Sequence, residues 1–328
     1  MSNAKPLEMN VAFATSMATP HHVEHAEQLG YTRAWLYDSP ALYPDVWAML
    51  AESARRTSRI VLGPGVLVPS LRHPMTNAAA IAMLMDLAPG RVNVAIGSGF
   101  TGRVALGQRP MRWADVRAYV ETVQALVAGE TVTWEGSRMR MMHPEGFGAP
   151  RPLTVPMLLG TGGPKGEAVA HELADGIFAT RPTTGFPRCS VLTLGTVLDD
   201  GQDPGSERVM LAARHAGALA FHAAHERGDV TKLPGGREWL DALELVPVED
   251  RHLAMHEGHL IDANERDRPF VTPEMLTKFG YVRDPAGWHA HLDLLANSGA
   301  TEIAYQPAGP DIPGELDRFA AMFRTRPD

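Results

Sequence analysis

Short apolar runs alternate with longer amphipathic stretches along most of this 328-residue chain. The apolar runs are rich in Val, Ile, Leu and Ala, which is typical of strands buried on both faces of a parallel sheet. The alternation of the two patterns predicts an α/β fold. Eight runs predict strands, at residues 10–15, 33–38, 59–68, 91–99, 155–160, 176–180, 190–198 and 302–307.

The amphipathic stretches between these runs predict helices. In the first of them, proline stands at the beginning and glycine follows the end, the usual placement of both residues. Eight strand–helix alternations favour a closed (β/α)8 TIM barrel over a doubly wound open sheet, which is the alternative. The predicted helices span residues 20–29, 46–57, 75–87, 113–128, 164–173, 206–227, 236–245 and 312–323.

The chain contains no Pro/Ser-rich linker and no internal repeat, so we predict a single domain over residues 9–328. Two insertions interrupt the predicted barrel, at about 99–153 and 201–285. Within the first, two short alternating runs joined by Glu135-Gly136 predict a β-hairpin. Residues 1–8 resemble an expression-tag remnant, so we exclude them from the fold prediction.

Composition restricts the partners that we expect. The net charge is −8 and no basic run occurs, which argues against nucleic acid. The most apolar window, AAAIAMLMDLA, is shorter than the roughly 20 residues that span a bilayer, and no signal peptide precedes it. The single cysteine, Cys189, is interpreted as a small core residue rather than a reactive thiol. We therefore expect a cytoplasmic protein, a homo-oligomer (dimer), with a small-molecule substrate.

Glycine and polar residues follow the predicted strands, at the end of a barrel where active sites lie. Asp38 ends the second strand, and Gly97, Ser98 and Gly99 end the fourth. Turns attract Gly and Ser for conformational reasons as well, so this signal has a purely structural alternative.

The densest glycine cluster follows the fifth predicted strand and precedes a helix. It lacks the Ser or Thr of a P-loop and the spacing of a Rossmann fingerprint. Backbone N–H groups, a helix N-terminus and a lysine remain as a generic phosphate cradle, and a simple tight turn is the alternative. The residues of this glycine loop are Gly160, Thr161, Gly162, Gly163, Pro164 and Lys165.

The segment RHLAMHEGHL contains three histidines. His252 and His256 are four residues apart and would share a helix face, and His259 follows. Their spacing is not that of an HExxH zinc site. A metal-dependent hydrolase on the same fold is one alternative. We favour the interpretation that this insertion segment lines the mouth of the barrel and that its histidines are not metal ligands. There the imidazoles would serve as hydrogen-bond or proton-transfer groups of a substrate lid.

Several stretches, taken in order, resemble the bacterial luciferase-like superfamily of flavin- and deazaflavin-dependent oxidoreductases. Residues 62–99 resemble its third and fourth strands, with an Arg-His-Pro turn, an alanine-rich helix, Pro-Gly-Arg and a Gly-x-Gly strand end. Residues 155–179 resemble its fifth and sixth strands, including the Ala-Asp-Gly turn. LGYTRAWLYDS resembles the second-strand segment. The resemblance is weak over residues 201–285.

This resemblance implies a flavin-type ring across the carboxyl end of the barrel. It implies a non-proline cis peptide at Gly65-Val66 against the ring, and Asp38 as a cofactor or substrate contact. The fourth-strand residues Gly97, Ser98 and Gly99 would also contact the cofactor. The glycine loop falls on the family's phosphate-binding loop, so the phosphate would belong to coenzyme F420 or FMN.

The resemblance therefore predicts an enzyme that transfers hydride between the deazaflavin F420 and a small organic substrate. An FMN-dependent monooxygenase that uses molecular oxygen is the alternative, and a cofactor-binding barrel without catalysis is a further one. Candidate catalytic residues are Asp38, His252 and His256. Many relatives carry Asp-His where this chain has Asp38-Ser39. The sugar-oxidising deazaflavin branch places a glutamate shortly after the fourth-strand glycines, where Phe100 stands here. Both departures argue against a sugar substrate.

Overall fold

The computed structural model describes residues 7–326, which form two compact units. The first unit contains residues 7–104, 109–192 and 295–304, and the second contains residues 105–108, 193–294 and 305–326. The sequence-based assignment of one domain with insertions stays a prediction, because compactness alone does not test whether each unit folds independently.

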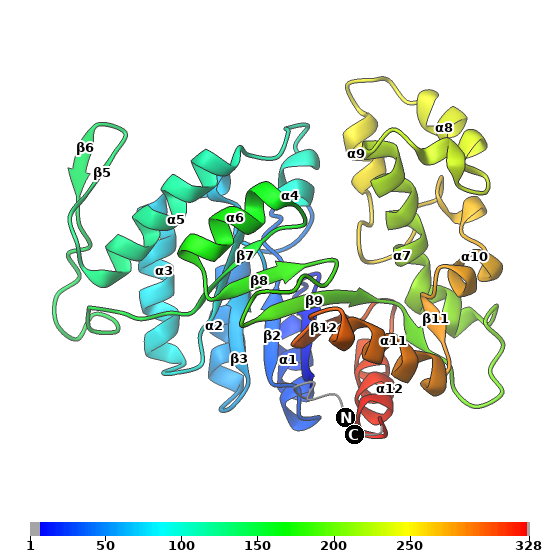
Figure 1. The fold of residues 1–328 in the computed structure, drawn as a ribbon, viewed down its shortest axis with the longest axis horizontal. Helices are drawn as coiled ribbons and strands as arrows, with labels where there is room; N and C mark the ends of the chain where they lie inside the picture. The colour runs from blue at the N-terminus through cyan, green and yellow to red at the C-terminus, as the bar shows by residue number, and fades with distance from the viewer. Residues whose placement is uncertain (1–6, 327–328) are drawn as a thin grey trace. The chain divides into compact units, whose positions relative to one another are not determined.

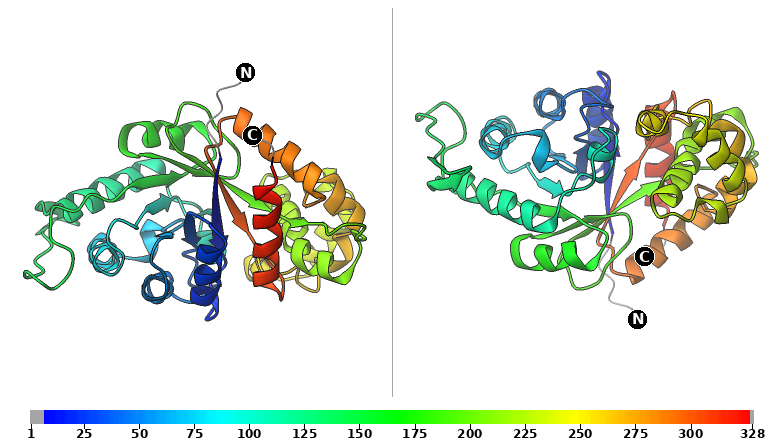
Figure 2. Two further views of the ribbon diagram at one scale, coloured as in Figure 1. Left: turned by 90° about the horizontal axis from the view of Figure 1, so that it is seen from below. Right: turned by 90° about the horizontal axis from the view of Figure 1, so that it is seen from above.

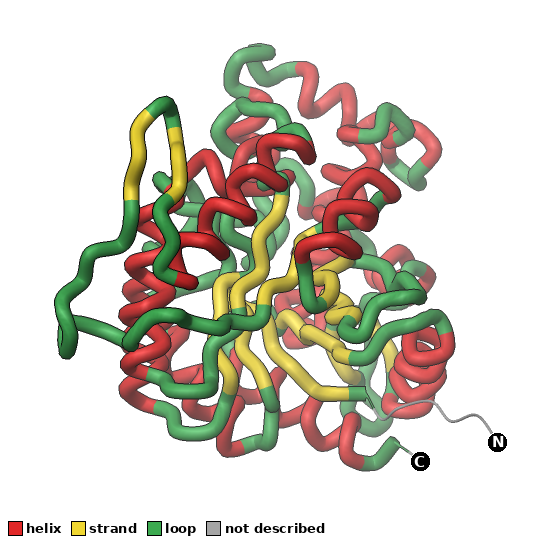
Figure 3. The backbone as a smooth tube through the Cα atoms, turned by 60° about the vertical axis from the view of Figure 1, so that its left-hand side comes forward, coloured by secondary structure: helices red, strands yellow, loops and turns green. Residues whose placement is uncertain are grey.

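One sheet of eight strands confirms the predicted barrel. Its order is β3-β2-β1-β12-β9-β8-β7-β4, and the bridges Leu62–Val92 and Leu67–Ile96 connect its two ends. The defined registers are parallel; for example, Ala34 pairs with both Val11 and Leu62. The strands lie side by side with helices outside them (Figure 3). They are β1 (Glu8–Phe13), β2 (Arg33–Leu36), β3 (Val61–Pro64), β4 (Val94–Gly97), β7 (Met157–Gly160), β8 (Gly176–Ala179), β9 (Cys189–Leu194) and β12 (Glu302–Gln306).

Five helices cover the first unit's strands in chain order. Each packs on the next, α1 on α2, α2 on α3, α3 on α5 and α5 on α6 (Figure 2). A short helix, α4 (Phe100–Val104), lies between β4 and α5. The five covering helices are α1 (Thr19–Gln28), α2 (Val46–Arg56), α3 (Pro74–Leu87), α5 (Trp113–Ala128) and α6 (Pro164–Leu173).

The predicted hairpin is confirmed as β5 (Val132–Trp134) and β6 (Ser137–Met139), an antiparallel pair that projects beyond α5 (Figure 1). Glu135 and Gly136 form its turn, with φ of 49° and 80°. Positive φ at both turn residues matches the twist of a two-residue hairpin.

One predicted strand boundary was wrong. The run at residues 190–198 is broken at Gly195, whose φ of 118° and close approach to the Tyr281 carbonyl redirect the chain. Beyond it, β10 (Thr196–Val197) pairs with β11 (Val282–Arg283) in a separate two-stranded sheet. At the amino end, Leu7 is buried and Glu8 begins β1. The assignment of residues 1–8 to a tag remnant stays a prediction. Its residues 1–6 lie outside the described part.

Large apolar side chains fill the first unit. Trp35 on β2 is fully buried and meets Phe178 on β8 edge to face, with ring centroids 5.3 Å apart. Cys189 is also fully buried, and burial raises the pKa of its thiol. The prediction of a core cysteine is confirmed.

The second unit is largely helical around its own apolar core. Phe221 and Trp239 stack in that core with ring centroids 5.7 Å apart. Within residues 7–326, no helix combines the length and apolarity that crossing a membrane requires. The helices are α7 (Glu207–Glu226), α8 (Gly236–Glu244), α9 (Arg251–His256), α10 (Pro273–Lys278), α11 (Pro285–Asn297), whose last residues belong to the first unit, and α12 (Ile312–Arg324).

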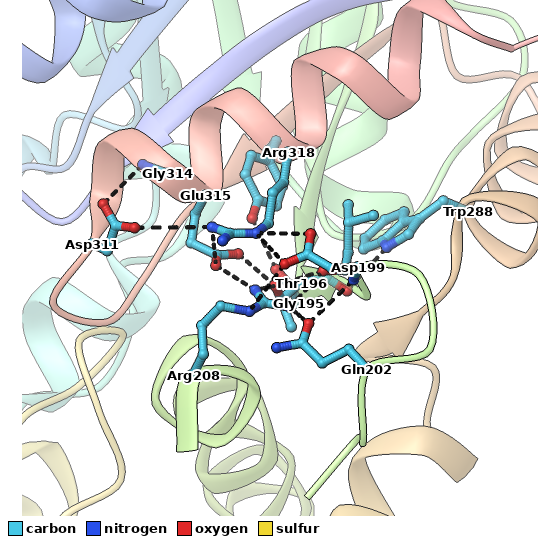
Figure 4. Close-up of polar contacts among 12 residues, drawn as sticks. Gly195, Thr196, Asp199, Gln202, Arg208, Trp288, Asp311, Gly314, Glu315 and Arg318 are labelled. Atoms are coloured by element: carbon cyan, nitrogen blue, oxygen red, sulfur yellow. Dashed lines mark hydrogen bonds and ion pairs between the residues drawn. The ribbon is translucent and has the colours of Figure 1, made fainter. Parts of the chain in front are cut away.

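A buried carboxylate connects α7, α12 and β10 in this unit. Glu315 is 2% exposed and accepts hydrogen bonds from Arg208 at 2.6 Å and from Thr196 at 2.5 Å (Figure 4). Trp288 donates to the Thr196 carbonyl at 3.1 Å. A buried carboxylate with these partners stabilises the packing of three elements, so we assign this cluster a structural role.

Candidate functional site

The site is built at the barrel mouth, by which we mean the ends of β2, β3, β4 and β7 and the residues that follow them. Asp38 lies here, 3% exposed, after β2. Its Oδ1 accepts from Arg72 Nη1 at 2.5 Å, and its Oδ2 accepts from the Val68 backbone N–H at 3.4 Å. Burial raises the pKa of the Asp38 carboxyl, and the Arg72 guanidinium acts in the opposite direction. Sequence reasoning identified Asp38 but missed Arg72, although the family-like Arg-His-Pro turn contains it.

The expected non-proline cis peptide is present at Gly65-Val66, directly after β3. The Val66 side chain packs over the ends of two other strands. A Cβ on Gly97 would lie 2.8 Å from Val66 Cγ2, and one on Gly160 would lie 2.7 Å from Cγ1. A Cβ on Gly65 would lie 2.9 Å from Trp35 Cβ. These three predicted site residues are therefore glycine for packing reasons, and their contact with a cofactor stays a prediction.

Val68 brings the fourth-strand residues next to Asp38. Gly99 has φ of 78°, and a Cβ there would lie 2.4 Å from Val68 Cγ1. The Ser98 carbonyl accepts from the Met111 N–H at 2.8 Å. Val68 thus connects Gly99 with Asp38, and the contact of Ser98 and Gly99 with a cofactor stays a prediction.

The glycine loop leaves room for a ligand at the start of α6. Gly163 is the N-cap residue of α6, and no side chain caps this helix end. A Cβ on Gly162 or on Gly163 would meet no protein heavy atom within 4 Å. An open helix N-terminus of this kind binds anions through its N–H groups and dipole. The loop fits a coenzyme phosphate.

The remaining residues of the glycine loop differ in their exposure to solvent. Pro164 and Lys165 are exposed, so the lysine charge is accessible to an anion, whereas Thr161 is 7% exposed. Gly166 has a different role, because a Cβ there would lie 2.3 Å from the Trp113 ring. This contact explains why glycine, not Ser or Thr, follows the lysine.

Two buried polar atoms of β2 and its extension have no hydrogen-bond partner within the described chain. They are Trp35 Nε1 and Tyr37 Oη. Burial raises the pKa of the Tyr37 phenol well above its ordinary value, so the hydroxyl stays a donor at neutral pH. A buried unsatisfied donor costs about 1–3 kcal/mol, which makes Tyr37 a candidate ligand contact. Sequence reasoning missed it, because an aromatic residue at a strand end reads as core.

The histidines belong to the second unit, where α9 carries His252 and His256. His256 Nδ1 lies 2.7 Å from the His252 carbonyl oxygen, and its ring lies 5.0 Å from that of His259. Burial lowers the pKa of His256. Among residues 7–326, no group of three His, Cys, Asp or Glu side chains could hold a metal ion.

Two further residues complete the histidine cluster. His222 Nε2 lies 2.7 Å from Asp267 Oδ2, and Trp239 Nε1 donates to Asp267 Oδ1 at 2.8 Å. The His222 ring lies 6.2 Å from that of His256. Sequence reasoning missed His222 and Asp267, which lie far from the quoted motif along the chain. The catalytic and lid roles of His252 and His256 stay predictions.

Comparison with known proteins places this site in a family. A family model described as luciferase-like monooxygenase matches residues 14–186. The F420-dependent glucose-6-phosphate dehydrogenase of Beutenbergia cavernae is 30% identical over 238 residues, covering 62% of this chain and 69% of that protein. The 5,10-methylenetetrahydromethanopterin reductase of Archaeoglobus fulgidus is 30% identical over 311 residues, covering 89% and 90%.

A solved structure supports the fold along the whole chain. The coenzyme F420-dependent tetrahydromethanopterin reductase from Methanopyrus kandleri superposes with a TM-score of 0.63 at 16% identity, covering 97% of this chain and 98% of that one. The expected resemblance is thereby confirmed. With more than half of its residues matched by the family model, the chain belongs to the luciferase-like monooxygenase family of oxidoreductases.

Proposed function

We propose that this protein is an oxidoreductase that transfers a hydride between coenzyme F420 and a small organic substrate. The similar dehydrogenase from Beutenbergia cavernae is F420-dependent by name, which favours the deazaflavin. The observation that carries the proposal is the open, uncapped start of α6 behind Gly162 and Gly163, since it suits the phosphate of a coenzyme tail.

The chain's own residues would supply binding and placement. The backbone N–H of Gly162 and the Lys165 ammonium would hold the anionic tail, whereas the Gly163 N–H donates to Thr161 Oγ1 at 3.4 Å. Val66, packed over Gly97 and Gly160, would support the ring from one side. When bound, F420 serves as a two-electron hydride carrier. The protein's contribution is to bring donor and acceptor carbon atoms close and to exclude water.

The barrel mouth argues against a sugar substrate. Ser39, 8% exposed, stands beside Asp38 where many relatives have histidine. Phe100 begins α4 and is 52% exposed, where sugar-oxidising relatives have an acidic residue nearby. Neither a hydroxyl nor a phenyl group can replace an imidazole and a carboxylate in proton transfer from a sugar hydroxyl. We infer a less polar substrate.

An FMN-dependent monooxygenase is the second candidate. The description of the matching family model favours it, and the open α6 terminus suits the phosphate of FMN equally well. Replacement of Gly162 and Gly163 by alanine tests both candidates, because neither added methyl group meets a protein atom. The double variant should keep the parent's melting temperature and lose at least tenfold in affinity for the cognate cofactor.

Fluorescence titrations with F420 and with FMN, on parent and variant, make the measurement. Gly205→Ala is the matched control, since its Cβ would meet only side-chain atoms at 3.4 Å or beyond. Binding of F420 but not FMN by the parent supports the main proposal, and the reverse supports the second. Equal affinities of parent and double variant would contradict the assignment of the glycine loop.

A further inference from the structure

We propose that Arg72 is a positioning residue, which holds Asp38 as a hydrogen-bond acceptor at the barrel mouth by bridging it to Asp45. This inference rests on the proposed function only for the part that concerns F420. In this proposal Asp38 accepts a hydrogen bond or provides a negative charge, and it does not donate a proton.

The bridge uses separate nitrogens of one guanidinium. Arg72 Nη1 donates to Asp38 Oδ1 at 2.5 Å, and Nη2 donates to Asp45 Oδ2 at 2.6 Å. The Asp38 side chain is 1% exposed and that of Arg72 13%, so water screens this pair little. The ion pair favours the charged carboxylate against the burial that opposes it.

Asp45 is itself held in place by the start of α2. It is the N-cap residue of that helix, and its Oδ1 accepts from the backbone N–H groups of Trp47 and Ala48, both at 3.0 Å. Its other oxygen therefore faces Arg72 in a set orientation. The guanidinium is therefore anchored on a carboxylate that is 52% exposed but is held in place by the start of α2.

The backbone of Arg72 is also held, by side chains from three helices. Tyr119 on α5 donates to the Arg72 carbonyl at 2.9 Å. Asn77 on α3 donates to the Tyr119 hydroxyl at 2.8 Å, and Trp47 on α2 donates to Asn77 Oδ1 at 2.9 Å. All three side chains are buried. Such a connected network of hydrogen bonds fixes the orientation of its members. If Arg72 served only to neutralise the Asp38 charge, its backbone would not need to be held in this way.

The direct test is a pH titration of the Asp38 carboxyl in the cofactor-free protein. NMR with carboxyl-labelled aspartate monitors the titration, and the Asp38→Asn variant assigns the Asp38 resonance. Arg72→Met should raise the measured pKa of Asp38 by at least one unit, and Arg72→Lys should restore part of that shift. Arg112→Met, which removes a surface arginine that pairs with Asp115, should leave the titration unchanged. The proposal is overturned if the Asp38 titration is the same in Arg72→Met and the parent.

Arg72→Gln provides a milder variant if Arg72→Met does not fold. Its amide can still donate a hydrogen bond to Asp38 but carries no charge, so a smaller rise of the Asp38 pKa in the same direction is expected. If Arg72 had a structural role alone, its replacement would lower the midpoint of unfolding and leave the pKa of Asp38 unchanged.

F420 titrations between pH 5 and 9 connect this result to the cofactor. Removing Arg72 leaves Asp38 protonated to higher pH, so the pH at which F420 affinity changes should move upward in Arg72→Met. In an Asp38→Asn background, Arg72→Met should have no further effect. If the parent does not bind F420, the proposed function fails, and the carboxyl titration still decides the role of Arg72.

Discussion

The two ends of the barrel arrange their buried polar groups differently. At the barrel floor, which we define as the starts of β1, β2 and β12 and the residue before β9, a single carboxylate collects three donors. Glu302 accepts from Asn10 at 2.9 Å, from Arg33 at 2.8 Å and from Arg188 at 2.8 Å, and is 3% exposed. Both arginines thus pair with a carboxylate inside the protein, although Arg188 Nη2 is buried without a hydrogen-bond partner in the described chain.

At the barrel mouth, fewer polar groups and less space are satisfied or filled by the protein itself. Glycines stand where side chains would otherwise fill the space around Val66, and the Tyr37 hydroxyl has no partner in the described chain. The start of α6 has no side-chain cap. The contrast indicates that the floor serves stability and the mouth serves binding, in accord with the general division of labour in TIM barrels.

The largest expected effect is at the floor. Glu302→Ala leaves two arginines and Asn10 without their common acceptor, so we expect a loss of about 3–5 kcal/mol in the free energy of unfolding. Urea denaturation measures it. The folded fraction should bind F420 with the parent's affinity. A weakened affinity in a protein of unchanged stability would break the comparison.

A smaller effect on stability is expected at Gly160, which packs against Val66 at the barrel mouth. Gly160→Ala places a methyl group 2.7 Å from Val66 Cγ1 and should cost about 1–3 kcal/mol through overpacking. Because Val66 must then move, F420 affinity should fall as well, which calorimetry and fluorescence titration can measure together. A Gly160→Ala variant indistinguishable from the parent in both would argue against the packing of Val66 given above.

The smallest effect is expected at the outer edge of the floor. Glu8 contacts Arg33 at 3.3 Å, but its side chain is 52% exposed. Glu8→Gln should therefore change the free energy of unfolding by less than about 0.5 kcal/mol, since solvent screens exposed ion pairs. The same urea experiment applies. A cost near that of Glu302→Ala would mean that the floor depends on net charge and not on buried contacts.

Most of the first unit's architecture was predictable from local pattern. The eight strands of the sheet and α5 were located from apolar periodicity, because each buries its apolar residues wherever its neighbours lie. The broken strand at Gly195 was not predictable, because only contact with the Tyr281 carbonyl shows why the chain turns there. Short helices such as α9 and α10 also depend on the apolar core of the second unit.

The candidate site was predictable in part, and for a similar reason. Asp38 and the glycine loop were found because strand ends and glycine clusters are visible in a single sequence. Arg72, Tyr37 and the partnership of Val66 with Gly97 and Gly160 were not, since each depends on side chains that the fold brings together.

Along the chain alone, hydrophobic period and turn residues determined that this protein is a β/α barrel with a glycine-rich loop after the fifth strand of the barrel, β7. Only the tertiary structure decided which glycines make room for Val66, which ones leave space for a ligand, and which guanidinium faces Asp38. The reason is physical: burial periodicity is a local property of ten or twenty residues, whereas packing and charge pairing join residues dozens of positions apart.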